Sequence, residues 1–318
     1  MGFTVWHNIV YSAKGGCGKT TFSSLFRIIN INSSNLKDKE IKNVGQGPLV
    51  LMDLDLLASN LGNAATDFID KTMEPKSNEN NLELFDYLVK NKPFRYSENY
   101  KIKYLKEDKG INEKFMLISS PCNEKLRGWF KAKRRYVPVV KYDDFRYGFM
   151  QLLRQMCDKN NYSEGSKSVN IVYDLPPNSD GYTEIVFDAL LNINSKMREF
   201  RSDGEKVEHK FRLFVLSLPD GTIMNVNLNW LDNFLTESGS NISLDFKYFL
   251  VNSYSGKTSS SGLDITLKKK LENKGIDVVF LLFGNLEVGS NEHVIDKMEL
   301  VNYNMPNYYI ANNKAYEK

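Results

Sequence analysis

Short runs of apolar residues recur along the chain and alternate with longer segments of mixed polarity. Several runs are continuous in Val, Ile, Leu and Phe instead of alternating with polar residues, which is typical of strands buried on both faces of a parallel sheet. The pattern predicts strands at Asn8–Ser12, Leu49–Asp55, Phe115–Ser119, Val169–Asp174, Phe211–Leu218, Phe246–Asn252 and Ile276–Phe283.

The segments between these runs show helical periodicity. Apolar residues at three- and four-residue spacing, which line one face of a helix, occur at Phe22, Leu25, Phe26 and Ile29. The segments Asp144–Cys157 and Gly181–Leu191 have a similar pattern. Alternating strands and helices predict an α/β fold: a doubly wound, mostly parallel sheet flanked by helices on both faces. We expect a single domain over residues 1–318.

Two segments depart from this alternation, and a third, which includes the helix predicted at 144–157, differs in its composition. Lys71–Lys114 is polar and predicts an insertion that contains a helix near Leu82–Val89. Residues 123–160 combine basic and aromatic residues with a helical pattern. Ser255–Gly262 is rich in serine and glycine and predicts a flexible loop after a strand.

The composition is that of an ordinary globular protein, with 42% hydrophobic and 25% charged residues. There is no apolar stretch of membrane-spanning length and no signal segment, so we expect a cytoplasmic protein. The three cysteines (Cys17, Cys122 and Cys157) show no metal-ligand spacing, which suits a reducing compartment. A net charge of +3 permits contact with nucleic acid but does not require it.

The most informative segment for function is the glycine-rich run from Lys14 to Thr21, which follows the first predicted strand. Its glycines let backbone N–H groups turn inward around an anion, and the donors of the following helix point at the same anion. Lys19 can reach the β- and γ-phosphates of a nucleotide, and the Thr20 hydroxyl is placed to bind Mg²⁺. The predicted nucleotide-binding residues of this loop are Gly15, Gly16, Cys17, Gly18, Lys19, Thr20 and Thr21.

Ala13 stands where the general phosphate-loop pattern has its first glycine. The run from Lys14 to Thr21 resembles instead the deviant Walker A loop of the ParA/MinD superfamily of ATPases, in the SIMIBI class. The resemblance implies a P-loop NTPase fold, ATP and Mg²⁺ as ligands, and a homodimer formed around ATP. It also implies that Lys14 is the signature lysine, which reaches phosphates bound by the other subunit. The likeness covers the core from about residue 5 to about residue 300.

Two carboxylates follow the second predicted strand. Asp53 and Asp55 come at its carboxyl end, the edge at which open α/β sheets bind ligands. The segment is similar to the first switch of MinD-like members, although Leu56 stands where ParA proteins usually have Pro. The resemblance implies that Asp55 orients the attacking water and that Asp53 supports the site. The alternative is that both carboxylates simply end a strand. The predicted catalytic set is Lys14, Lys19 and Asp55.

Two later strands also end in candidate site residues. Asp174, followed by Pro176 and Pro177, resembles the Walker B and second-switch element of the superfamily, and Asn178 stands where Gly often follows. Mg²⁺ takes only one or two carboxylates and keeps several waters, and the predicted metal set is Thr20, Asp53 and Asp174. Asn252 ends a late strand, where the superfamily commonly places an Asn against adenine. The alternative for Asn252 is a turn-forming residue.

The target of such an ATPase is the least determined property. The tail at 302–318 lacks the apolar stripe of a membrane-binding helix. Basic runs at 127–136 and 268–270 are candidates for non-specific DNA contact, and the alternative is a solvated charged surface. We expect slow ATP hydrolysis, stimulated by a partner protein, in plasmid or chromosome partitioning or in intracellular positioning. The alternatives are a regulator or assembly factor acting on a protein partner and, more weakly, a metal-cluster carrier, for which no cysteine pair is evident.

Overall fold

The computed structural model describes the strands of the core, the loop after the first strand, one long helix and parts of other helical segments. The described residues are 3–24, 26, 48–55, 61, 115–118, 149–150, 152–154, 156–158, 162, 165–177, 186–187, 190, 207–237, 244–252, 269 and 271–281. The predicted insertion at 71–114, the basic run at 127–136 and the tail at 302–318 lie outside these residues, as does most of 268–270.

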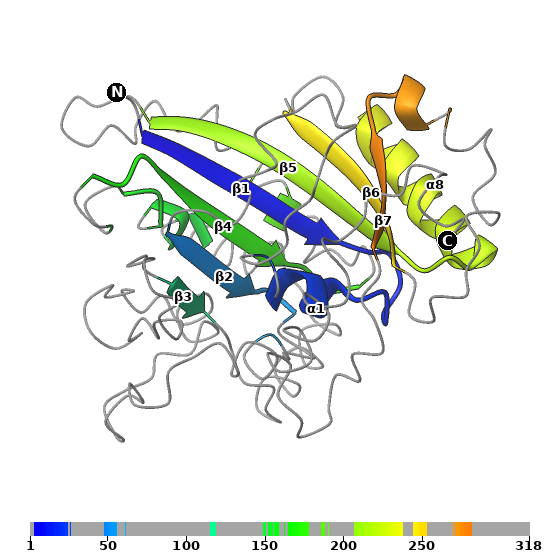
Figure 1. Ribbon diagram of the computed structural model, residues 1–318, viewed down its shortest axis with the longest axis horizontal. Helices are drawn as coiled ribbons and strands as arrows, with labels where there is room; N and C mark the ends of the chain where they lie inside the picture. Colours follow the sequence, from blue (N-terminus) through cyan, green and yellow to red (C-terminus); the bar gives the residue numbers. More distant parts are fainter. Residues whose placement is uncertain are drawn as a thin grey trace, which may run out of the picture.

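Seven strands form one parallel sheet across the described residues (Figure 1). They are β1 (Phe3–Tyr11), β2 (Leu49–Asp53), β3 (Phe115–Ile118), β4 (Ser168–Asp174), β5 (Val207–Ser217), β6 (Phe246–Asn252) and β7 (Asp277–Leu281). The order across the sheet is β3-β2-β4-β1-β5-β6-β7, and every neighbouring pair is parallel. Each predicted strand is confirmed. In six of the seven, the first or last residue differs from the predicted one, and only β6 has the predicted bounds.

The chain winds away from β1 in two directions. β2, β3 and β4 lie on one side of β1, whereas β5, β6 and β7 lie on the other side. In open α/β sheets the ligand binds outside the carboxyl ends of the strands, where the winding direction changes. The glycine-rich loop after β1 lies at this point, so the topology places the predicted site where such folds bind ligands.

Helices cover both faces of the sheet. Helix α1 (Lys19–Ser24) packs Phe22 against Phe214 of β5, with ring centroids 5.2 Å apart. Helix α8 (Gly221–Glu237) packs Trp230 against Tyr11 of β1, at 3.9 Å. Phe214 is level with Val10 of β1 in the register, whereas Tyr11 is one residue further on and points to the opposite face. The predicted doubly wound α/β architecture is confirmed.

Strands β1 and β5 begin earlier than the apolar pattern predicts. They pair continuously from Phe3 opposite Val207 to Tyr11 opposite Val215. Their first halves contain polar residues, including His7 on β1 and His209 on β5, which interrupt the apolar run. Backbone pairing between two neighbouring strands therefore extends the sheet beyond the segments that the side-chain pattern marks.

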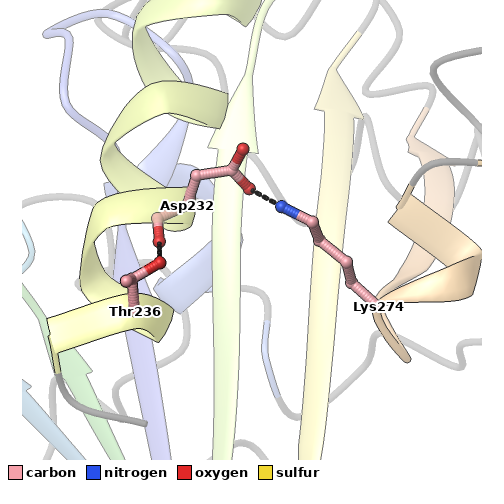
Figure 2. A network of polar contacts seen from close by, with 3 residues as sticks. All are labelled: Asp232, Thr236 and Lys274. Carbon is pink, nitrogen blue, oxygen red and sulfur yellow. Dashed lines mark hydrogen bonds and ion pairs between the residues drawn. The ribbon is translucent and has the colours of Figure 1, made fainter.

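Helix α8 was not among the predicted helices. Asp220 caps its start, because one carboxylate oxygen accepts hydrogen bonds from the backbone N–H groups of Thr222 and Ile223 at 2.9 and 3.0 Å. On its exposed side, Asp232 forms an ion pair with Lys274, and the Thr236 hydroxyl donates to the Asp232 carbonyl (Figure 2). Such a partly exposed ion pair contributes at most about 1 kcal/mol.

Other helical residues fall within the predicted helices. Residues 149–150, 152–154 and 156–157 lie within the predicted helix at 144–157, and residues 186–187 and 190 lie within that at 181–191. A helix long and apolar enough to cross a membrane does not occur in the described part of the chain.

Candidate functional site

The glycine-rich loop connects the end of β1 to α1. Gly16 and Gly18 have φ angles of 76° and 89°, a left-handed conformation that favours glycine because it has no Cβ. The carbonyl of Gly18 accepts the N–H of Phe22 at 2.8 Å and so starts α1. Lys19 is buried, with 7% of its surface exposed, whereas Lys14 is exposed. One lysine thus points into the protein and the other is accessible to a second molecule.

The other loop residues lie between these two lysines. Gly15 and Gly16 are exposed, Gly18 is half-buried, and the Cys17 thiol is buried with its sulfur 3.9 Å from the Gly15 carbonyl oxygen. The residues that follow Lys19, Thr20 and Thr21, are half-buried. Their phosphate contacts remain predictions.

Asn227 of α8 forms hydrogen bonds with the backbone and side chain at the start of this loop. The sequence pattern did not indicate this residue. Its side-chain oxygen accepts hydrogen bonds from the Ala13 N–H at 2.7 Å and the Ser12 hydroxyl at 3.3 Å. Its amide donates to the Ile223 carbonyl at 3.1 Å, which orients the oxygen toward the loop. The Ser12 oxygen accepts the N–H of Lys14 at 3.3 Å. Asn227 therefore positions the backbone that carries Lys14.

A signal for Asn227 exists in the sequence once α8 is recognised. Met224, Leu228 and Leu231 form the buried face of the helix, and position 227 lies on that face at helical spacing. An asparagine in an apolar stripe needs a polar partner, because burying an unpaired amide is costly.

Asp53, the last residue of β2, is fully buried. Its two carboxylate oxygens accept the backbone N–H groups of Asp55 at 3.2 Å and Leu61 at 3.0 Å. These bonds fix the chain that leaves β2, and they hold the half-buried Asp55 at the carboxyl edge of the sheet. Asp53 therefore orders the segment that carries Asp55, and its part in the site stays a prediction.

Asp174, the last residue of β4, lies opposite Asp53 in the sheet. Its side chain is buried, and neither of its oxygens has a well-formed hydrogen bond from a described residue, although the Thr20 hydroxyl is near enough to lower its pKa. Burial and the nearby Asp53 carboxylate raise the pKa of Asp174 from 3.8 to about 7, with a smaller contribution from Asp55. Lys19 and the Thr20 side chain lower this pKa and so offset part of the rise. The structure therefore brings five of the predicted site residues together at one edge of the sheet: Lys19, Thr20, Asp53, Asp55 and Asp174.

This arrangement fits a divalent cation such as Mg²⁺. The unpaired oxygens of Asp174 need a positive partner, and the Thr20 hydroxyl is close enough to influence the same carboxyl group. Mg²⁺ prefers oxygen ligands and commonly takes one or two carboxylates. The oxygens of Asp53 already accept two backbone donors, so Thr20 and Asp174 are the better ligands of the predicted set.

The second-switch segment lies against the phosphate loop. The N–H of Leu175 donates to the Val10 carbonyl at 3.1 Å, which extends the pairing of β4 with β1 past Asp174. A Cβ added at Gly15 would lie 4.0 Å from Pro177, so the two segments are neighbours. Asn178 is outside the described residues. Asn252 ends β6 at the same sheet edge, its side chain is not described, and its adenine contact stays a prediction.

No family model and no curated protein matches the chain. Among solved structures, a plasmid partition protein from Borrelia burgdorferi is similar over 95% of this chain and 99% of its own, with 12% identity and a TM-score of 0.49. A structure named as a partition protein is similar over 95% of this chain and 73% of its own, with 11% identity and a TM-score of 0.40. Similarities this weak say nothing about activity, and the site rests on the geometry above.

Proposed function

We propose that this chain is an ATP-dependent dimerisation switch of the ParA/MinD type that acts in plasmid or chromosome partitioning or in intracellular positioning. The observation that carries the proposal is the meeting of three separate segments at one sheet edge. The glycine-rich loop with the buried Lys19, the end of β2 with the buried Asp53, and the end of β4 with the buried Asp174 carboxylate meet there. Phosphoryl transfer needs little else from a protein than charge neutralisation, a metal ion and a positioned water.

Each residue has a distinct part in this proposal. The loop N–H groups and Lys19 bind the phosphates, and Thr20 with Asp174 holds Mg²⁺, which neutralises phosphate charge when bound. Asp55 orients the attacking water, while Asp53 holds the segment that carries Asp55. Lys14, which is exposed, reaches the nucleotide of a second copy of the chain.

Binding of Mg²⁺–ATP, measured by isothermal titration calorimetry, tests the nucleotide site. We expect Lys19→Ala to weaken binding at least about 30-fold, since it removes one partner of a buried charge pair. Lys167→Ala is the matched control, because Lys167 is an exposed lysine at the opposite end of the sheet, just before β4. Wild-type protein that bound no adenine nucleotide with Mg²⁺ would end the proposal.

Dimerisation is tested separately, by light scattering during size-exclusion chromatography with and without ATP. Lys14→Ala should keep bound nucleotide but form less ATP-dependent dimer than wild type. Lys167→Ala again serves as control. A Lys14→Ala protein that dimerised and hydrolysed ATP like wild type would show that Lys14 has no role across the interface.

Retention on non-specific DNA distinguishes partitioning from control of a protein partner. Salt-sensitive retention that requires ATP supports partitioning, since phosphate contacts weaken as salt increases. Replacing Lys133, Arg134 and Arg135 by Ala should reduce this retention while dimerisation continues. Dimerisation without any DNA retention would instead support a regulator or assembly factor.

A further inference from the structure

A second polar cluster lies within the core, away from the phosphate loop. Two of the chain's three histidines and one of its three cysteines meet there. His7 belongs to β1, His209 to β5, and Cys157 to the helical residues at 156–157. One potential ligand atom from each of the three lies within 4.8 Å of the other two. The fold thus joins residues whose spacing in the sequence indicates no metal site.

The ring of His7 is fixed on both of its nitrogens. Its Nε2 lies 3.0 Å from Nδ1 of His209, and its Nδ1 lies 2.8 Å from the Tyr173 hydroxyl oxygen. Phe211 stacks on one face of the ring, with centroids 4.6 Å apart. His7 and Cys157 are buried, and His209 is only partly buried. A cation from solvent would therefore reach the cluster from the His209 side.

The distances are close to those of a zinc site. Zinc binds nitrogen at about 2.0–2.1 Å and sulfur at about 2.3 Å, so tetrahedral ligand atoms lie roughly 3.3–3.6 Å apart. The facing nitrogens of His7 and His209 are already 3.0 Å apart. All three ligand atoms lie within 4.8 Å of one another. They would therefore need to approach each other by at most about 1 Å, which side-chain rotation can supply.

We propose that His7, Cys157 and His209 bind a zinc-class divalent cation. Two imidazoles and one thiolate form a donor set that suits Zn²⁺ and disfavours Mg²⁺ and Ca²⁺. On binding, the Cys157 thiol loses its proton to solvent, and the two facing nitrogens exchange their shared hydrogen bond for bonds to the metal. Tyr173 then accepts the other ring N–H of His7 and fixes its orientation. A water takes the fourth position.

The consequence is a metal-dependent connection between β1, β5 and the helical residues at 156–157. A cation that binds only the folded chain stabilises it in proportion to the logarithm of its concentration over Kd. The cluster is independent of the nucleotide site, because His7 lies four residues before the end of β1, about 13 Å along the strand. Its side chain shares the face of Tyr11, opposite α1.

Cobalt(II), a spectroscopic substitute for zinc, tests the site in the metal-stripped, nucleotide-free full chain. Wild type should bind one equivalent of Co²⁺, with visible bands of tetrahedral cobalt and a near-ultraviolet thiolate-to-cobalt band, and Zn²⁺ should displace it. Cys157→Ser should lose the thiolate band. His209→Ala should bind at least about tenfold more weakly. Excess Mg²⁺ should displace neither metal.

Matched controls separate this cluster from other cysteines and histidines. Cys17→Ser and His293→Ala should keep both the stoichiometry and the thiolate band. His209→Gln, a change at the partly exposed member, covers the case in which Cys157→Ser does not fold, with circular dichroism as the check on folding. Absence of the thiolate band in wild type, or equal cobalt binding by wild type, Cys157→Ser and His209→Gln, would overturn the proposal and leave a hydrogen-bonded core.

Discussion

Two polar clusters are buried in the same sheet, and they differ in charge and in pairing. At the carboxyl edge, Asp174 has no hydrogen-bond partner among the described residues, and burial beside Asp53 raises its pKa to about 7. In the middle of the sheet, His7 pairs with His209 and Tyr173. Burial lowers the pKa of His7 and lowers that of His209 to about 4, so both rings are neutral at physiological pH.

This difference in charge and pairing shows which cluster is compatible with a purely structural role in the core. A neutral, hydrogen-bonded group is tolerated in a core, whereas an unpaired buried carboxylate destabilises it. Strongly perturbed carboxylates of this kind are typical of functional sites. The edge cluster therefore has the electrostatic character of a cation-binding site. The histidine cluster has hydrogen-bond partners without a metal and metal ligands in the proposed site, so only a metal-binding measurement decides whether it holds a metal.

The largest expected effect follows from replacing Asp174 by Asn. The change removes the charge that we assign to Mg²⁺ while keeping the shape of the side chain, and we expect ATP turnover to fall on the order of 100-fold. Steady-state ATPase assays with Mg²⁺ measure it. Asp220→Asn is the control, because asparagine caps a helix as well as aspartate does. Unchanged ATP turnover in Asp174→Asn would contradict the assigned difference between the two clusters, since Asp174 would then be a buried acid without a metal-binding role.

The same substitution should stabilise the metal-free protein, and increasingly so as pH rises. The pKa of Asp174 is about 7 in the folded chain and 3.8 ordinarily, so the folded state binds more protons between these values. Its contribution to stability is therefore present at low pH and is lost as pH rises through about 7. The advantage of Asp174→Asn should grow by up to a few kcal/mol between about pH 5 and pH 8.

Urea unfolding with a chelator at several pH values measures this gain. The histidines add an opposite pH dependence, because a lowered histidine pKa costs stability on acidification. That contribution is common to wild type and variant and cancels in the difference. An advantage that stayed constant across the pH range would mean that Asp174 is not the group that titrates.

Asn227→Ala should lower the free energy of unfolding by about 1–3 kcal/mol, since it leaves the Ala13 N–H and the Ser12 hydroxyl without their acceptor. Asn229→Ala, on the exposed side of α8, is the matched control. Because Asn227 supports the loop backbone, we also expect weaker ATP binding at a temperature where the variant is fully folded. Equal ATP affinity in both variants would limit Asn227 to stability.

The sequence predicts the charged edge better than the histidine cluster, and the reason is physical. Strands buried on both faces are continuous apolar runs, and Asp53 and Asp174 directly follow such runs at the edge where ligands bind. His7 and His209 lie in the parts of β1 and β5 where that pattern fails. Only the pairing of these strands with each other brings the two histidines together.

The smallest expected effect lies within the histidine cluster. Tyr173→Phe removes the hydroxyl that contacts His7, and a neutral hydrogen bond contributes about 1 kcal/mol. A double-mutant cycle with His7→Phe, measured by urea unfolding of the metal-free protein, isolates the interaction from changes in packing. We expect a coupling energy of about 1 kcal/mol, because each single change leaves a buried polar group without its partner.

The direction of the stability change caused by Tyr173→Phe sharpens the contrast with Asp174. Tyr173→Phe should destabilise the chain at neutral pH, whereas Asp174→Asn, one residue further along β4, should stabilise it. Adjacent residues point to opposite faces of a strand, so the two substitutions probe the two clusters with little shared packing. If both changes shifted stability in the same direction, the distinction between a satisfied core cluster and an unsatisfied ligand site would fail.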